Sequence, residues 1–189
     1  MRAIVNVATG KRYLNGQKRL QDNLMSTFKP AQRPDFVNWL AIPQRWPTHQ
    51  AVPYGFKAHA MAEAGRTFST LLWCDSSIML GTRPLEDLWQ KIEQDGYWIS
   101  KNGDWNNYQW TADAADPDLF PACFMKGWSE CWGDWARGTN RGIQHVIAGA
   151  FGISLEHPTG RAILEEYLRL AKTKAFCGPW RTDWTKCMF

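Results

Sequence analysis

The chain has 189 residues, 44% of them hydrophobic and 21% charged, a composition typical of one globular domain and unlike that of a disordered segment. No apolar run approaches the roughly 18 residues that a membrane span needs, and residues 1–7 hold too short an apolar region for a signal peptide. The five cysteines are odd in number and form no C-x-x-C pair, which argues against a zinc ribbon or a redox motif. We therefore expect a cytoplasmic protein with reduced thiols.

Two features of the composition stand out, namely the distribution of charge along the chain and the number of tryptophans. Residues 1–66 carry 10 Lys and Arg against 3 Asp and Glu, whereas residues 67–189 carry 12 against 15. A basic first third attracts phosphate-bearing ligands, although a solvated surface gives the same pattern. Tryptophan occurs 12 times, often in polar surroundings. Its flat apolar face suits stacking on a sugar ring or a base, and it equally suits fixing long loops onto a small core.

The first 80 residues alternate between strand-like and helix-like patterns. Short apolar runs bounded by polar residues are typical of buried strands, and leucines four residues apart are typical of a helix face. In chain order we expect a strand at 2–8, a helix at 15–28 capped by Asn15, a strand at 35–40, a loop at 43–53, a helix at 54–64 and a strand at 70–74. This order predicts the α/β class, with a mostly parallel central sheet flanked by helices.

The second half has clear elements on either side of an irregular stretch. We expect a helix at 84–95 ended by Gly96, a short strand at 97–100, a strand at 142–155 and a helix at 158–174 that begins at Pro158. Residues 101–141 are rich in Trp, Asn, Asp and Gly and have poor periodicity, so we expect loops and short helices there, one of them over 116–124. No domain boundary is visible, which predicts a single domain over residues 1–189.

Two turns stand out as candidate ligand sites. The strand at 70–74 runs into Asp75, Ser76 and Ser77, and the first strand runs into a basic turn that contains Gly10. Ligands of open α/β sheets bind beyond the carboxyl ends of the strands. A carboxylate beside hydroxyls suits a sugar, a ribose or a hydrated divalent cation. The alternative is that Asp75 ends the strand and its side chain caps the turn. Neither a P-loop nor a G-x-G-x-x-G motif follows.

Several short stretches together resemble bacterial and phage-borne glycosyltransferases of the GT-A fold. In that family an aromatic-Lys helix precedes a strand ending in W-x-D-x-S-I; here residues 54–61 read YGFKAHAM and residues 71–78 read LLWCDSSI. Residues 8–13 are similar to the first strand and nucleotide-side turn of such enzymes. Residues 110–113 and 149–160 also fit. The resemblance covers most of the chain, and each motif is short.

This resemblance implies transfer of a sugar from a nucleotide-sugar donor to a saccharide or other hydroxyl acceptor. In the GT-A fold a D-x-D motif at a strand end holds a divalent metal, manganese or magnesium, and the donor diphosphate. Asp75 matches the first Asp and would be the metal ligand, whereas Ser77 stands where the second would be, and a hydroxyl is a weaker cation ligand than a carboxylate. Comparable proteins continue beyond Trp180 with a segment that completes the site. That leaves open a fragment, a shortened form or an inactive relative.

Glycosyl transfer needs a neutralised phosphate leaving group, an aligned donor and, in an inverting enzyme, a carboxylate base. A metal at Asp75 and Ser77 meets the first need, or Lys57, Lys11 or Arg12 meets it directly; for Lys57 the alternative is a lysine whose stem lies on the helix and whose ammonium reaches solvent. We expect the donor to contact Thr9, Gly10, Tyr13, Lys57, Asp75 and Ser77, and the acceptor sugar to contact Trp110 and Trp180. Asp113 is the candidate base, with a helix N-cap as its alternative.

Three other functions remain as rivals. A non-catalytic carbohydrate- or nucleotide-binding module, a degenerate transferase, would use the same loops without turnover. A nucleic-acid-binding protein would use the basic first third, but the interleaved basic and aromatic residues of RNA-binding sheets are missing. A glycosidase needs two carboxylates facing each other across the sugar, and nothing in the sequence favours such a pair.

Overall fold

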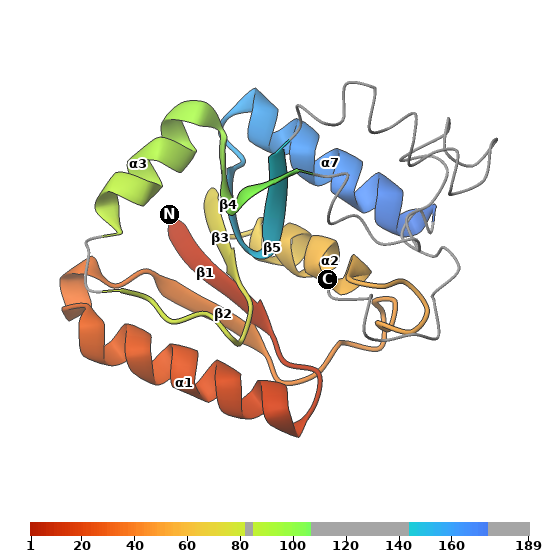
Figure 1. Ribbon diagram of the computed structural model, residues 1–189, viewed down its shortest axis with the longest axis horizontal. Helices are drawn as coiled ribbons and strands as arrows, with labels where there is room; N and C mark the ends of the chain where they lie inside the picture. Colours follow the sequence, from red (N-terminus) through yellow and green to blue (C-terminus); the bar gives the residue numbers. More distant parts are fainter. Residues whose placement is uncertain (82–84, 107–143, 174–189) are drawn as a thin grey trace.

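A computed structural model describes residues 1–81, 85–106 and 144–173. These residues form a five-stranded sheet between two layers of helices (Figure 1). Helices α1 (Lys11–Thr27) and α3 (Glu86–Asp95) cover one face, and helices α2 (Gly55–Ala64) and α7 (Pro158–Lys172) cover the other. None of the helices in the described ranges combines the length and apolarity that crossing a bilayer requires.

The strand order across the sheet is β2-β1-β3-β5-β4. Strand β1 (Arg2–Val7) is parallel to β2 (Asp35–Trp39) and to β3 (Thr70–Cys74). Strand β5 (Gln144–Ser154) is antiparallel to both of its neighbours, β3 and β4 (Tyr97–Asn106). Strand β5 therefore opposes the common direction of the other strands. The predicted α/β class with a mostly parallel sheet is confirmed.

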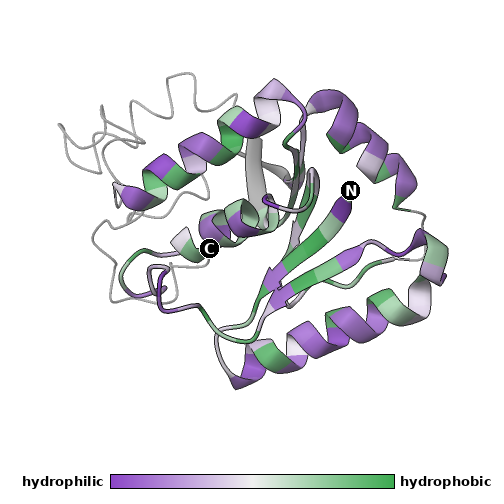
Figure 2. Cartoon of the chain, turned by 180° about the vertical axis from the view of Figure 1, so that it is seen from behind, coloured by the Kyte–Doolittle hydropathy of each residue, from purple (hydrophilic) through white to green (hydrophobic). Residues whose placement is uncertain are grey.

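The sheet is buried on both faces, which explains the nearly continuous apolar runs of β1 and β3. Side chains at alternate positions of β1, such as Val5 and Val7, pack with α2 and α7. The intervening Ile4 packs with Leu20 and Leu24 of α1 and with residues of α3. Figure 2 shows the middle of the sheet mainly hydrophobic and the visible sides of α1 and α3 mainly hydrophilic.

Helix α1 begins at Lys11, four residues before the start that was predicted at Asn15, so Asn15 is not its cap. The chain turns directly from the end of β1 into the helix through Gly10, whose φ of 141° is rarely adopted by other residues. The helix therefore starts directly after Gly10 and earlier than predicted, and Asn15 is an exposed residue inside it.

The other described elements lie close to their predicted positions. Gly96 ends α3 in the left-handed conformation, with φ of 84°. Pro158 opens α7, and the His157 side chain accepts a hydrogen bond from the Thr159 amide. Strand β4 extends well past the short strand expected at 97–100, because it pairs along β5 with two register shifts. The helix expected at 116–124 lies outside the described residues.

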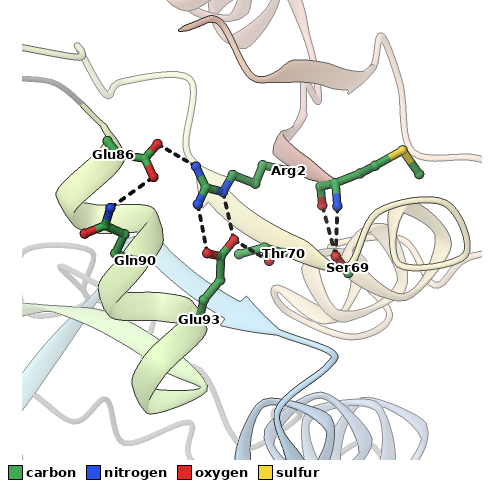
Figure 3. A network of polar contacts seen from close by, with 7 residues as sticks. Arg2, Ser69, Thr70, Glu86, Gln90 and Glu93 are labelled. Atoms are coloured by element: carbon green, nitrogen blue, oxygen red, sulfur yellow. Dashed lines mark hydrogen bonds and ion pairs between the residues drawn. The ribbon is translucent and has the colours of Figure 1, made fainter.

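The amino ends of β1 and β3 are closed by a polar network (Figure 3). Arg2 donates to both carboxylate oxygens of Glu93, at 2.7 and 2.8 Å, and to Glu86 at 2.6 Å. Thr70 donates to Glu93, and the amino terminus donates to Ser69. This network ties α3 to the sheet at the end opposite the two candidate turns.

Candidate functional site at the carboxyl ends of β1 and β3

The parallel register of β1 and β3 brings the two candidate turns to one edge of the sheet. Val5 pairs with Trp73, so the two strands end close to the same level. Thr9, Gly10 and Tyr13, which follow β1, are all exposed there. Asp75 follows β3 and is held against β5, because its backbone amide donates to the Gly149 carbonyl at 2.7 Å.

Helix α2 places Lys57 against Asp75. The Lys57 Nζ lies 2.9 Å from Oδ1 of Asp75 and donates to the Ala148 carbonyl of β5 at 2.8 Å. Lys57 is only 2% exposed, so the alternative of an ammonium reaching solvent is wrong. The Asp75 side chain retains 35% of its exposure. The pair therefore joins a buried cation to a carboxylate that solvent still reaches.

Trp73 makes the second contact to the same carboxylate oxygen. Its indole Nε1 donates to Oδ1 of Asp75 at 2.7 Å. Among the described residues, the donors that reach the Asp75 side chain thus converge on Oδ1. The Asp75 side chain does not cap the turn, which is closed instead by the Ile78 amide and the Asp75 carbonyl at 2.9 Å.

Aromatic rings surround the Lys57 ammonium. Nζ lies 5.2 Å from the ring centroid of Trp73 and 5.3 Å from that of Tyr54, within the range of cation–π attraction. Phe56 and Phe151 pack against Trp73 and extend the aromatic cluster. The rings exclude water from the ammonium and fix its position relative to Asp75.

Tyr54 has an unusual backbone for its residue type. It is the described non-glycine residue with positive φ, at 60°, and it directly precedes α2. Its amide donates to Nδ1 of His49 at 3.1 Å, and its carbonyl accepts from the Tyr167 hydroxyl at 3.3 Å. These contacts hold a left-handed conformation that costs about 1–3 kcal/mol. Tyr54 remains 40% exposed beside Asp75.

The electrostatics of the site follow from burial and from the ion pair. Burial lowers the pKa of Lys57, and the charge and hydrogen bond of Asp75 oppose that effect. Burial and the Lys57 charge lower the pKa of His49. Burial raises the pKa of Tyr54, and the charges of Asp75 and Tyr13 add to this. Both tyrosines therefore lie within electrostatic reach of one another at the edge of the sheet.

A buried polar network fixes the turn from the face of the sheet opposite α2. Asn6 of β1 donates to the Cys74 carbonyl at 2.6 Å and lies 3.4 Å from the Ser76 hydroxyl. Gln17 of α1 donates to Oδ1 of Asn6 at 2.8 Å. Buried polar side chains are retained where their hydrogen bonds are satisfied, and here each one connects α1 to the residues on either side of Asp75.

Helix α1 also contacts the turn directly. A Cβ on Gly16 would lie 2.5 Å from the Ser76 carbonyl oxygen, so only glycine allows this close approach. Arg19 donates to the same carbonyl at 3.2 Å, and Oδ1 of Asn23 accepts from the Leu80 amide at 2.7 Å. The Asp75 turn is therefore held between α1, β1 and β5.

The described residues do not fit a divalent cation site. Ser77, which occupies the second position of the D-x-D pattern, is exposed. The Lys57 ammonium already occupies one oxygen of Asp75. Within residues 1–81, 85–106 and 144–173, no group of three His, Cys, Asp or Glu side chains is placed to hold a metal ion. Manganese or magnesium at Asp75 stays a prediction from the sequence.

Three predicted site residues lie outside the described residues, namely Asp113, Trp110 and Trp180. Their roles stay predictions. Sequence reasoning missed the roles of Trp73, Tyr54 and Asn6. A polar Asn6 among the apolar side chains of strand β1 was a signal for a buried network, because such a side chain must find partners inside the protein.

No family model matches the chain, and no curated protein matches its sequence. Among solved structures, the chain is similar to a glycosyltransferase involved in the glycosylation of the major capsid of PBCV-1. The TM-score is 0.50 at 12% sequence identity, and the match covers 100% of this chain and 71% of that one. At this identity the likeness concerns the fold alone. The protein therefore has a glycosyltransferase-like α/β fold, as the sequence motifs implied.

Proposed function

We propose that this protein transfers a sugar from a nucleotide-sugar donor to an acceptor hydroxyl. The donor would bind at the carboxyl ends of β1 and β3. The observation that carries the proposal is the Asp75 carboxylate, partly exposed at the end of a central strand of a glycosyltransferase-like fold and fixed by Lys57 and Trp73. Ligands of such sheets bind at this edge.

In this proposal the exposed residues beside Asp75 bind the nucleotide. Tyr13 and Tyr54 are 53% and 40% exposed, and tyrosine rings suit stacking on a base or a sugar. Thr9 and Gly10 supply backbone and hydroxyl groups next to them, and Asp75 accepts a hydrogen bond from a donor hydroxyl. Lys57 acts as a positioning residue, because its ammonium is buried and already bonded to Asp75 and to the Ala148 carbonyl.

The reaction breaks the bond between the anomeric carbon and the phosphate oxygen, and the electron pair leaves with the nucleoside diphosphate. The acceptor oxygen forms the new bond to the anomeric carbon, and its proton passes to a base, for which Asp113 is the sequence-based candidate. Preorganised positive charge must stabilise the leaving group. Acceptor contacts by Trp110 and Trp180 belong to the same proposal.

A thermal-shift screen tests the donor site, with a panel of nucleotides that contains UDP, GDP, CDP, ADP, dTDP and CMP. A ligand that binds only the folded state at 100 times its Kd adds about 2.7 kcal/mol of stability. We expect one member to raise the Tm of the wild type, and Asp75→Asn to abolish that rise. Asp22→Asn, which changes an exposed carboxylate on α1, is the matched control and should keep it.

Slow hydrolysis of the matching nucleotide sugar without acceptor would then separate a transferase from its rival, the non-catalytic binding module. Nucleotide binding without any hydrolysis or transfer would support the module. A panel in which no nucleotide changes the Tm would refute a donor site at this edge of the sheet.

A further inference from the structure

We infer that the nucleotide site works without a divalent cation, with the buried ammonium of Lys57 occupying the place on Asp75 that a metal ion would need. This inference rests on the proposed function, because it concerns how the same donor is bound. It departs from the metal that the GT-A resemblance implies.

The first step is that burial and two polar contacts hold Lys57 against Asp75. Its side chain is 3% exposed, and its Nζ is bonded at 2.9 Å to Asp75 and at 2.8 Å to the Ala148 carbonyl. The Nζ atom also lies 5.2 Å from the ring centroid of Trp73 and 5.3 Å from that of Tyr54. A metal ion that displaced the ammonium would leave a buried, unpaired charge, which is strongly unfavourable.

The second step is that a dication does not bind readily beside this pair. An ion on Oδ2 would share one carboxylate with the ammonium on Oδ1, and the two positive charges would repel one another across a few ångströms. A cation site normally offsets such repulsion with further carboxylates. Within the described ranges no group of three His, Cys, Asp or Glu side chains is placed to do so.

The third step concerns what the carboxylate can still bind. The Lys57–Asp75 pair is neutral as a unit, so a neutral hydroxyl group suits it better than an ion. A hydroxyl that donates to Oδ2 forms a charge-assisted hydrogen bond, which is shorter and stronger than a bond between neutral groups. The ribose and the transferred sugar of a nucleotide-sugar donor both offer such hydroxyls.

Basic side chains of the protein then neutralise the negative charge of the diphosphate. Lys11 and Arg12 are exposed and directly follow Gly10 at the same edge of the sheet, and the first turn of α1 contains no acidic residue to oppose them. In this inference, these two cations offset the negative charge that a metal ion offsets in the GT-A enzymes that the sequence resembles.

Isothermal titration of the full chain with the nucleotide identified by the panel tests the inference. The titration is run in excess EDTA and again in excess Mn²⁺ or Mg²⁺. We expect the two Kd values to agree within about threefold, and we expect Asp75→Asn to raise the Kd about tenfold or more in both conditions. Asp22→Asn should leave both values unchanged.

The variant Lys57→Met sharpens the test, because it removes the positive charge from Asp75, while the Trp73 indole still donates to Oδ1. We expect Mn²⁺ to tighten nucleotide binding by this variant more than by the wild type. If Lys57→Met fails to fold, the wild-type titrations still decide.

The outcomes separate the two proposals. Binding by the wild type only with metal would overturn the inference and leave the proposed function standing. No binding of any nucleotide, with or without metal, would overturn the proposed function and the inference with it. Equal binding in EDTA and in metal supports both.

Discussion

Removing the Asp75 carboxylate should destabilise the fold as well as the site. In Asp75→Ala the Lys57 ammonium keeps its buried position, 2% exposed, but loses the negative charge 2.9 Å away. The indole N–H of Trp73 loses its acceptor at the same time. The variant therefore buries one unpaired charge and one unpaired donor.

The magnitude follows from the exposure of the pair. Breaking a fully buried ion pair by removing one partner costs about 3–5 kcal/mol. Water replaces part of the lost carboxylate here, because the Asp75 side chain is 35% exposed. We therefore expect Asp75→Ala to lower the free energy of unfolding by about 2–3 kcal/mol near neutral pH.

The pH dependence gives a second signature. Burial lowers the pKa of Lys57, and Asp75 opposes that effect in the wild type, so the variant should have the lower pKa. Between that folded pKa and the unfolded value of about 10.4, the unfolded state binds more protons, so stability rises with pH. The gap between Asp75→Ala and the wild type should therefore shrink as the pH rises toward 10.

Urea denaturation followed by tryptophan fluorescence, at about pH 7 and about pH 9.5, measures both effects. The control is Asp22→Ala, which removes an exposed ion pair with Lys18 on α1 and should change the free energy of unfolding by less than about 0.5 kcal/mol. An Asp75→Ala loss no larger than that of the control, or a gap that widens at high pH, would refute the buried pair.

Three further predictions concern residues that support the turn and the sheet. Gly16→Ala should lower the Tm although alanine favours helices by about 1 kcal/mol, because its Cβ would lie 2.5 Å from the Ser76 carbonyl oxygen; an unchanged or raised Tm would argue against this contact. Asn6→Ala should cost about 1–3 kcal/mol in urea denaturation, since it leaves buried groups without partners, and a loss below that range would mean that the network adjusts without it. Glu93→Gln should cost about 1 kcal/mol at neutral pH. The Arg2 hydrogen bond lowers the pKa of Glu93, so this contribution is present above about pH 4.5 and lost as the pH falls through the folded pKa. Unfolding curves at several pH values should show the wild type and Glu93→Gln converging in acid, and a constant difference would contradict the ion pair.

Much of the fold could be predicted from local patterns. The strands at β1, β2 and β3 and the helices α2, α3 and α7 follow from apolar runs, helical spacing and end signals such as Gly96 and Pro158. Their alternation also predicted the shared direction of the first strands. Prediction failed where one residue's backbone conformation decided the outcome, as Gly10 did at the start of α1.

The candidate site was predictable only as separate pieces. The sequence singled out Asp75, Lys57, Thr9, Gly10 and Tyr13, because strand-end carboxylates and basic or glycine-containing turns carry their own local signal. It could not pair Lys57 with Asp75, since the two are 18 positions apart and an ion pair depends on how α2 packs on the sheet.

The sequence by itself determined the α/β alternation, the buried strands and the position of Asp75 at a strand end, because these depend on neighbouring residues and on hydrophobic periodicity. Only the tertiary structure decided that β5 runs against β3, that its Ala148 carbonyl reaches Lys57 and that Asn6 and Gln17 hold the turn from the other face. Those contacts join distant parts of the chain, and their energies arise from burial, which no local pattern specifies.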